Sequence, residues 1–123
     1  MSRILLSIKP EYVAKIFTGA KKYEYRKRIA SKCVSTILIY ETYPTCMVVG
    51  EVKVIGTLSS SPSAIWEDTK KYAGISREKY RKYYKGCKHS FAYCLGDFIK
   101  YEQPIPLSEL GVNKSPQSFI YLD

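Results

Sequence analysis

The sequence predicts an α+β fold: a small mixed or antiparallel β-barrel, with one helix after the first strand and a helical insert near residues 62–86. The expected elements run β-α-β-β-β, then helices, then two more β segments. Short strands in this number, with few helices, favour a barrel over a doubly wound parallel sheet. A length of 123 residues suits one self-sufficient core, so we expect a single domain over residues 1–123.

The first elements are a strand, a helix and a short second strand. Ile4–Ile8 is apolar enough for a buried strand. Pro10 fits the first turn of a helix over Pro10–Thr18, because a backbone N–H is not needed there. Gly19 is expected to end that helix, since glycine adopts positive φ at little cost. A strand over Lys22–Lys27 should follow.

Two longer β segments come next. Ser35–Thr42 contains a continuous apolar run typical of a central strand. Met47–Leu58 is rich in β-branched residues, and its internal Gly50 and Gly56 indicate the bends or bulges that barrel strands need. The side chains expected on one face of this segment are Val48, Val52 and Val54.

The helical insert is predicted from its start signals. Ser61 should cap a helix over Ser63–Ala73, with Pro62 at the first helical position. Ser76 should cap a second helix, Arg77–Lys85, which has a basic outer face.

The C-terminal part predicts further β structure. Ser90–Leu95 and Asp97–Tyr101 form two strands or one bent strand. Pro104–Leu110 reads as a connector with one helical turn, and Ser118–Leu122 as a final strand.

The net charge of +9 is concentrated in two blocks. Residues 1–35 and residues 70–100 each carry nine Lys or Arg against two acids, a balance of +7 apiece. If the fold joins the blocks, they would form a positive surface for phosphates, and many of the 12 tyrosines would offer stacking faces for unpaired bases. A merely solvated basic face is the alternative. The candidate phosphate contacts are Lys22, Lys27, Arg28, Lys32, Arg77, Arg81, Lys82 and Lys85.

A G-x-K-x-x-E-x-R motif begins at Gly19 and supplies the candidate site, Lys21, Glu24 and Arg26. Glu24 and Arg26 share one face of the expected strand, whereas Lys21 has the opposite parity and can join them only from the preceding turn or through a bulge. Arg26 offers a planar fork for phosphate, carboxylate or a base edge. Glu24 can accept hydrogen bonds or act as a base, which makes Lys21 and Glu24 the catalytic candidates. A purely structural ion pair is the alternative.

Metal, cofactor and membrane roles find little support in the sequence. Its four cysteines form no C-x-x-C pair and its one histidine, His89, is expected to be structural, so we predict no metal site and no cofactor. No apolar run approaches the roughly 20 residues of a membrane span. The N-terminus has no signal-peptide pattern, and we therefore expect a cytoplasmic protein, in a monomeric state.

Several short segments together resemble the ASCH domain, a family of the PUA-like superfamily of small β-barrels. Besides the motif, they are L-S-I-K-P (Leu6–Pro10), I-W-x-x-T (Ile65–Thr69), A-G-I (Ala73–Ile75) and P-Q-S-F (Pro116–Phe119). The resemblance implies a barrel with a cleft beside the first helix, into which the motif residues point. It also implies binding of RNA or a nucleobase-containing ligand, with a regulatory role in transcription or translation.

The resemblance leaves an enzymatic alternative open. One branch of the family removes the acetyl group from N4-acetylcytidine, and ribonuclease activity is reported for other members. The deacetylating branch resembles this chain at Lys21 but has a threonine at the position of Glu24, and a glutamate where this chain has Tyr72, Ala73 and Gly74. We therefore favour a binding cleft over a hydrolase of N4-acylcytidine type or a ribonuclease.

Overall fold

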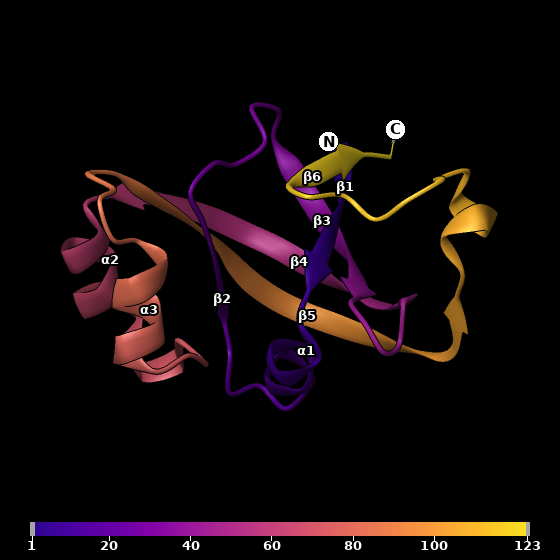
Figure 1. Ribbon diagram of the computed structural model, residues 1–123, viewed down its shortest axis with the longest axis horizontal. Coiled ribbons are helices and arrows are strands. Elements are labelled where there is room, and N and C mark those ends of the chain that lie inside the picture. Colours follow the sequence, from indigo (N-terminus) through magenta and orange to yellow (C-terminus); the bar gives the residue numbers. More distant parts are fainter. Residues whose placement is uncertain (1, 123) are drawn as a thin grey trace.

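The computed structural model describes residues 2–122 as one curled sheet with helices around it (Figure 1). The elements are β1 (Ser2–Ile8), α1 (Pro10–Phe17), β2 (Tyr23–Arg26), β3 (Val34–Glu41), β4 (Met47–Ser60), α2 (Pro62–Thr69), the 3-10 turn η1 (Lys70–Tyr72), α3 (Arg77–Tyr83), β5 (Ser90–Ile105), the 3-10 turn η2 (Leu107–Leu110) and β6 (Phe119–Tyr121). The six strands pair in the order β2-β5-β4-β3-β1-β6.

The sheet is mixed and curls into a half-barrel. β1 and β3 are parallel, and the other neighbouring strands are antiparallel. Although β5, β4 and β3 separate β2 from β1 in the sheet, the Arg26 side chain in β2 reaches the Ser7 carbonyl in β1 at 2.9 Å. This contact requires the sheet to bend back on itself. The α+β class and the mixed barrel architecture are thus confirmed, as a curled sheet with β2 and β6 at its edges.

The long antiparallel pair β4–β5 is where the sheet bends. Its register shifts at three places, and two of the shifts border Gly50 and Gly56, as predicted. A side chain at position 50 would collide with the Phe17 ring of α1, so the glycine also lets α1 pack closely. β5 is one continuous strand that extends through Ile105; the prediction that the connector starts at Pro104 is wrong, because Ile105 still pairs with Val48.

Both faces of the sheet are buried, and one predicted face assignment fails. Val52 packs with Ile37 and Ile39, whereas Val48 packs with Leu5 and Leu38, in a different cluster. Alternation along a strand puts Ile37 and Leu38 on opposite faces. Val48 was expected on the same face as Val52, but the register shift against β3 leaves Val49 as one extra residue on β4 and reverses the parity.

The helical insert packs against β2 and β5 at one end of the sheet (Figure 1). Both predicted caps are confirmed: the Ser61 hydroxyl accepts from the Ala64 N–H, and the Ser76 hydroxyl accepts from the Lys79 N–H. Helix α2, the first helix of the insert, is shorter than predicted because it changes to a 3-10 turn after Thr69. Within residues 2–122, no helix is long and apolar enough to cross a membrane.

Candidate functional site

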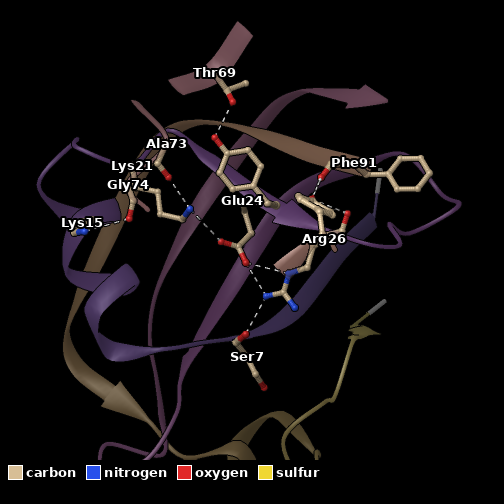
Figure 2. A network of polar contacts seen from close by, with 11 residues as sticks. Ser7, Lys15, Lys21, Glu24, Arg26, Thr69, Ala73, Gly74 and Phe91 are labelled. Carbon is tan, nitrogen blue, oxygen red and sulfur yellow. Dashed lines mark hydrogen bonds and ion pairs between the residues drawn. The ribbon is translucent and has the colours of Figure 1, made fainter. Parts of the chain in front are cut away.

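The turn between α1 and β2 directs Lys21 inward. Gly19 adopts a φ of +81°, and the Lys21 N–H donates to the Lys15 carbonyl at 3.1 Å, so the chain wraps around the end of α1. The Lys21 side chain then lies 4.0 Å from Glu24, measured from Nζ to Oε1. The predicted grouping of Lys21 with Glu24 and Arg26 is confirmed as geometry, and Lys21 joins it from the turn (Figure 2).

Lys21 is an almost fully buried amine with an exposure of 4%. Its Nζ donates to the Ala73 carbonyl at 2.9 Å (Figure 2). The same atom lies 4.8 Å from the centre of the Tyr25 ring. Its aliphatic stem lies against Gly74, where an added Cβ would be only 2.6 Å from Lys21 Cγ. Burial lowers the pKa of Lys21 from its ordinary 10.5, and the neighbouring Glu24 carboxylate opposes that effect.

Glu24 and Arg26 form a two-point ion pair. Glu24 Oε2 accepts from Arg26 Nε at 3.0 Å and lies 2.7 Å from Arg26 Nη2, which also donates to the Ser7 carbonyl. Glu24 Oε1 has only the Lys21 amine nearby among residues 2–122, and Arg26 Nη1 has no protein acceptor there. One acceptor and the donors of Nη1 are therefore left for a ligand.

Buried tyrosines tie this strand to the helical insert. The Tyr25 and Thr69 hydroxyls are 2.7 Å apart, and Thr69 donates to the Ile65 carbonyl, so Tyr25 is the donor of the pair. The Tyr84 hydroxyl is 3.1 Å from the Arg26 carbonyl. Burial raises the pKa of Tyr25 and of Tyr84, which keeps both phenols protonated. These contacts fix the position of α2 and α3 relative to the motif.

A cavity of about 490 Å³ lies between α1, β2 and α3, and the three motif side chains line its polar side. We call it the motif cavity. Tyr12 of α1 and Tyr83 of α3 contribute rings to its wall. Lys9, Lys79 and Lys82 are exposed and add positive charge, which Glu11 partly offsets by pairing with Lys79 at 3.4 Å. The motif cavity thus combines a buried polar set with aromatic walls and a basic margin.

The two basic blocks of the sequence meet at this cavity, but the predicted phosphate contacts do not all lie there. Lys82 lines it, and Lys27 Nζ lies 4.9 Å from the centre of the Tyr83 ring, so it joins the first block to α3. Arg77 and Arg81 line a different cavity, next to α2. The remaining predicted contacts are exposed elsewhere and are Lys22 over Tyr72, Lys32 over Tyr121, Arg28 and Lys85.

Sequence reasoning missed the rest of the lining, which includes the charged and aromatic side chains of Lys9, Glu11, Tyr12, Lys79 and Tyr83. Lys79, Lys82 and Tyr83 have the spacing of one helix face, which is a signal that the sequence did contain. His89 lines neither cavity; its Nε2 is 2.6 Å from the Ser59 hydroxyl. Within residues 2–122, no three His, Cys, Asp or Glu side chains are placed to hold a metal ion.

Comparison with known proteins gives one consistent domain. A family model described as the ASCH domain matches residues 6–104. An "ASCH domain-containing ribonuclease" of Zymomonas mobilis is 30% identical over 126 residues, spanning 96% of this chain and 82% of the relative. The crystal structure of ASCH from Zymomonas mobilis superimposes with a TM-score of 0.90 at 28% identity, covering 98% of this chain and 87% of that one.

Other relatives are much longer than this chain. A large ribosomal subunit protein uL22 of Ureaplasma parvum is 32% identical over 120 residues, which are 97% of this chain but 39% of the relative. An ATP synthase subunit alpha of the same species is 29% identical over 120 residues, and the match spans 15% of its length. The similarity to these proteins therefore concerns one part of each.

Proposed function

Because this chain belongs to the ASCH domain family, we propose that it binds single-stranded RNA and holds one unpaired nucleotide in the motif cavity. The observation that carries this proposal is the buried set Lys21–Glu24–Arg26 on the wall of a cavity of about 490 Å³. A volume in the range of about 300–1,000 Å³ suits small organic ligands.

The unused atoms of the set match a nucleobase edge. Glu24 Oε1 can accept a hydrogen bond, and Arg26 Nη1 and the Lys21 amine can donate. The edge of an unpaired base presents donors and acceptors side by side, and single-stranded RNA is read through such edges and through stacking on aromatic rings. Tyr12 and Tyr83 supply rings in the cavity wall.

A purely structural role explains the site less well. The Glu24–Arg26 pair does connect β2 to β1, through Ser7. Lys21 links the turn before β2 to the Ala73 carbonyl, but it does so with a buried charge. Removal of a charge from water costs stability unless good partners compensate. A ligand that uses the amine gives a reason to keep it there.

The exposed lysines at the margin supply the second part of the proposal. Lys9, Lys79 and Lys82 lie where a phosphate backbone would leave the cavity. Contacts of this kind add affinity that does not depend on sequence and that decreases with salt. We also propose a regulatory role in transcription or translation, which the protein would exert by binding RNA.

The test is equilibrium binding of short single-stranded RNAs to the wild type and to Glu24→Gln. The substitution keeps the shape but removes one negative charge, so charge alone would strengthen RNA binding. We expect instead a loss of about tenfold, because the charged acceptor for the base is gone. Glu102→Gln removes the same charge from an exposed position on β5 and is the matched control. Equal affinities for Glu24→Gln and Glu102→Gln would refute the proposal.

A second candidate, RNA cleavage in the same cavity, rests on the lowered pKa of Lys21 beside a carboxylate. An amine that releases its proton readily can act in proton transfer, and one relative is named as a ribonuclease. The deacetylase alternative is disfavoured because the stretch Tyr72–Gly74 supplies no carboxylate beside Lys21. Labelled RNA and N4-acetylcytidine, incubated with wild type and Lys21→Met, separate the candidates, since only an enzyme gives turnover that the variant loses.

A further inference from the structure

A second cavity, of about 560 Å³, lies between α2 and α3. We call it the insert cavity. Its walls include Trp66 of α2 and the exposed cations Arg77, Arg81 and Lys88. It is separate from the three motif residues, and no role follows for it from the family motif.

The insert cavity is strongly positive. The side chains of Arg77, Arg81 and Lys88 form no hydrogen bond or close ion pair within residues 2–122, although Arg77 lies near enough to Glu67 to interact with its charge. Glu67 is the one acid in the lining, and it is already paired with Lys70 at 2.8 Å. Two guanidinium groups that form no hydrogen bond within residues 2–122 are suited to bind phosphate oxygens at two points.

Trp66 gives this cavity an aromatic surface. The Trp66 ring is half-buried and lies 4.7 Å from Tyr80, between ring centres. Its indole N–H has no acceptor among the described residues, whereas the Tyr80 and Tyr84 hydroxyls are used by backbone carbonyls. Trp66 is therefore the ring in this wall with both a stacking surface and a spare donor.

Helix α3 separates the two cavities and supplies cations to both. Lys79 and Lys82 line the motif cavity, while Arg77 and Arg81 line the insert cavity. This division follows from helical spacing, since residues three or four apart share a face. Tyr80 lines both cavities, so they are adjacent across one buried side chain.

We propose that the insert cavity is a second RNA subsite, which holds the nucleotide next to the one in the motif cavity. Trp66 stacks on its base, and Arg77 and Arg81 hold the phosphate between the two nucleotides or beyond them. Aromatic stacking beside a phosphate fork, next to a cavity with the same combination, is the pattern of a single-stranded nucleic acid path. This inference rests on the proposed function of the motif cavity.

Fluorescence of Trp66 tests the inference directly, because it is the only tryptophan of the chain. The probes are nucleoside monophosphates and a random-sequence single-stranded RNA of eight nucleotides. We expect the oligonucleotide to quench Trp66 emission saturably. In the double variant Arg77→Ser/Arg81→Ser the oligonucleotide affinity should fall about tenfold or more. Lys100→Ser/Lys114→Ser, which removes two exposed charges elsewhere, should bind nearly as the wild type does.

The outcomes distinguish the two proposals. If the oligonucleotide binds in a manner that depends on Glu24, but Trp66 emission stays constant and both double variants behave alike, the second subsite is refuted and the motif cavity stands. If neither probe binds the wild type, the proposed function fails and this inference fails with it. Circular dichroism of each variant confirms that the fold is retained.

Discussion

Lys21 is the residue whose buried environment can be tested most sharply. Its amine is nearly buried, and its pKa is lowered mainly because burial disfavours the charged form. The sequence predicted it beside Glu24, by way of the turn or of a bulge, and the chain takes the route through the turn after Gly19. The partner that holds it, the Ala73 carbonyl, is 52 residues away and left no signal in the sequence.

The lowered pKa of Lys21 should make the free energy of unfolding depend on pH. As pH rises from the lowered pKa toward 10.5, the unfolded chain holds a proton on Lys21 that the folded protein has released, so stability gains with pH in that interval. Lys21→Met removes the titrating group. In urea unfolding, we expect the free energy of unfolding of the wild type to rise relative to that of the variant between about pH 7 and about pH 10. A difference that stays constant with pH would contradict the lowered pKa.

Arg26 is predicted to matter for stability as well as for binding. Arg26→Ala would remove the contact with Ser7 and leave the buried Glu24 carboxylate without its main partner. We expect a loss of about 2–4 kcal/mol in the free energy of unfolding. In the double variant Glu24→Gln/Arg26→Ala, part of the loss should be recovered, because the unpaired charge is gone. If the stability losses of the two single variants simply add in the double variant, Glu24 and Arg26 are not coupled.

At the scale of elements, the sequence predicts the order and the local structure of the helices and strands better than their packing. The element order, both serine caps and the bends at Gly50 and Gly56 all follow from local chemistry. The burial of Val48 does not, since one extra residue reverses the parity of β4, and only its pairing with β3 reveals this. The packing of α2 and α3 against the motif strand likewise depends on long-range contacts, such as that between Tyr25 and Thr69.

The turn between η1 and α3 should be sensitive to substitution at Gly74. Gly74 and Gly86 both have positive φ, of +64° and +82°, so alanine at either position costs about 1 kcal/mol through the backbone. Gly86 has open space around it, whereas a Cβ at position 74 would collide with the Lys21 stem. We therefore expect Gly74→Ala to destabilise by about 1–3 kcal/mol more than Gly86→Ala in thermal or urea unfolding, and to weaken RNA binding. Equal effects would show that Lys21 does not pack there.

At the scale of the whole molecule, curvature of the sheet makes the site. Arg26 can reach Ser7 only because β2 returns toward β1, and α3 brings the second basic block to the same cavity. The sequence shows two basic blocks, but the spacing of cations along a chain does not determine which of them lie on the same surface of the fold. Arg77 and Arg81 accordingly lie at a different cavity from Lys82.

The salt dependence of RNA binding should report this charge distribution. Each phosphate contact to single-stranded nucleic acid adds about −0.7 to the slope of log affinity against log salt. Lys82→Gln, at the motif cavity, should reduce the slope by about that amount. Lys114→Gln removes an equal charge from an exposed position that lines neither cavity and should leave the slope nearly unchanged. Identical slopes for the two variants would mean that Lys82 makes no phosphate contact.

The central claim is that the motif cavity holds an unpaired nucleotide, and a crystal structure with a short single-stranded RNA tests it most directly. We expect a base in the cavity, with one of its donors facing Glu24 Oε1 and an acceptor facing Arg26 Nη1 or the Lys21 amine. RNA bound to another surface, with the cavity between α1, β2 and α3 left empty, would contradict it.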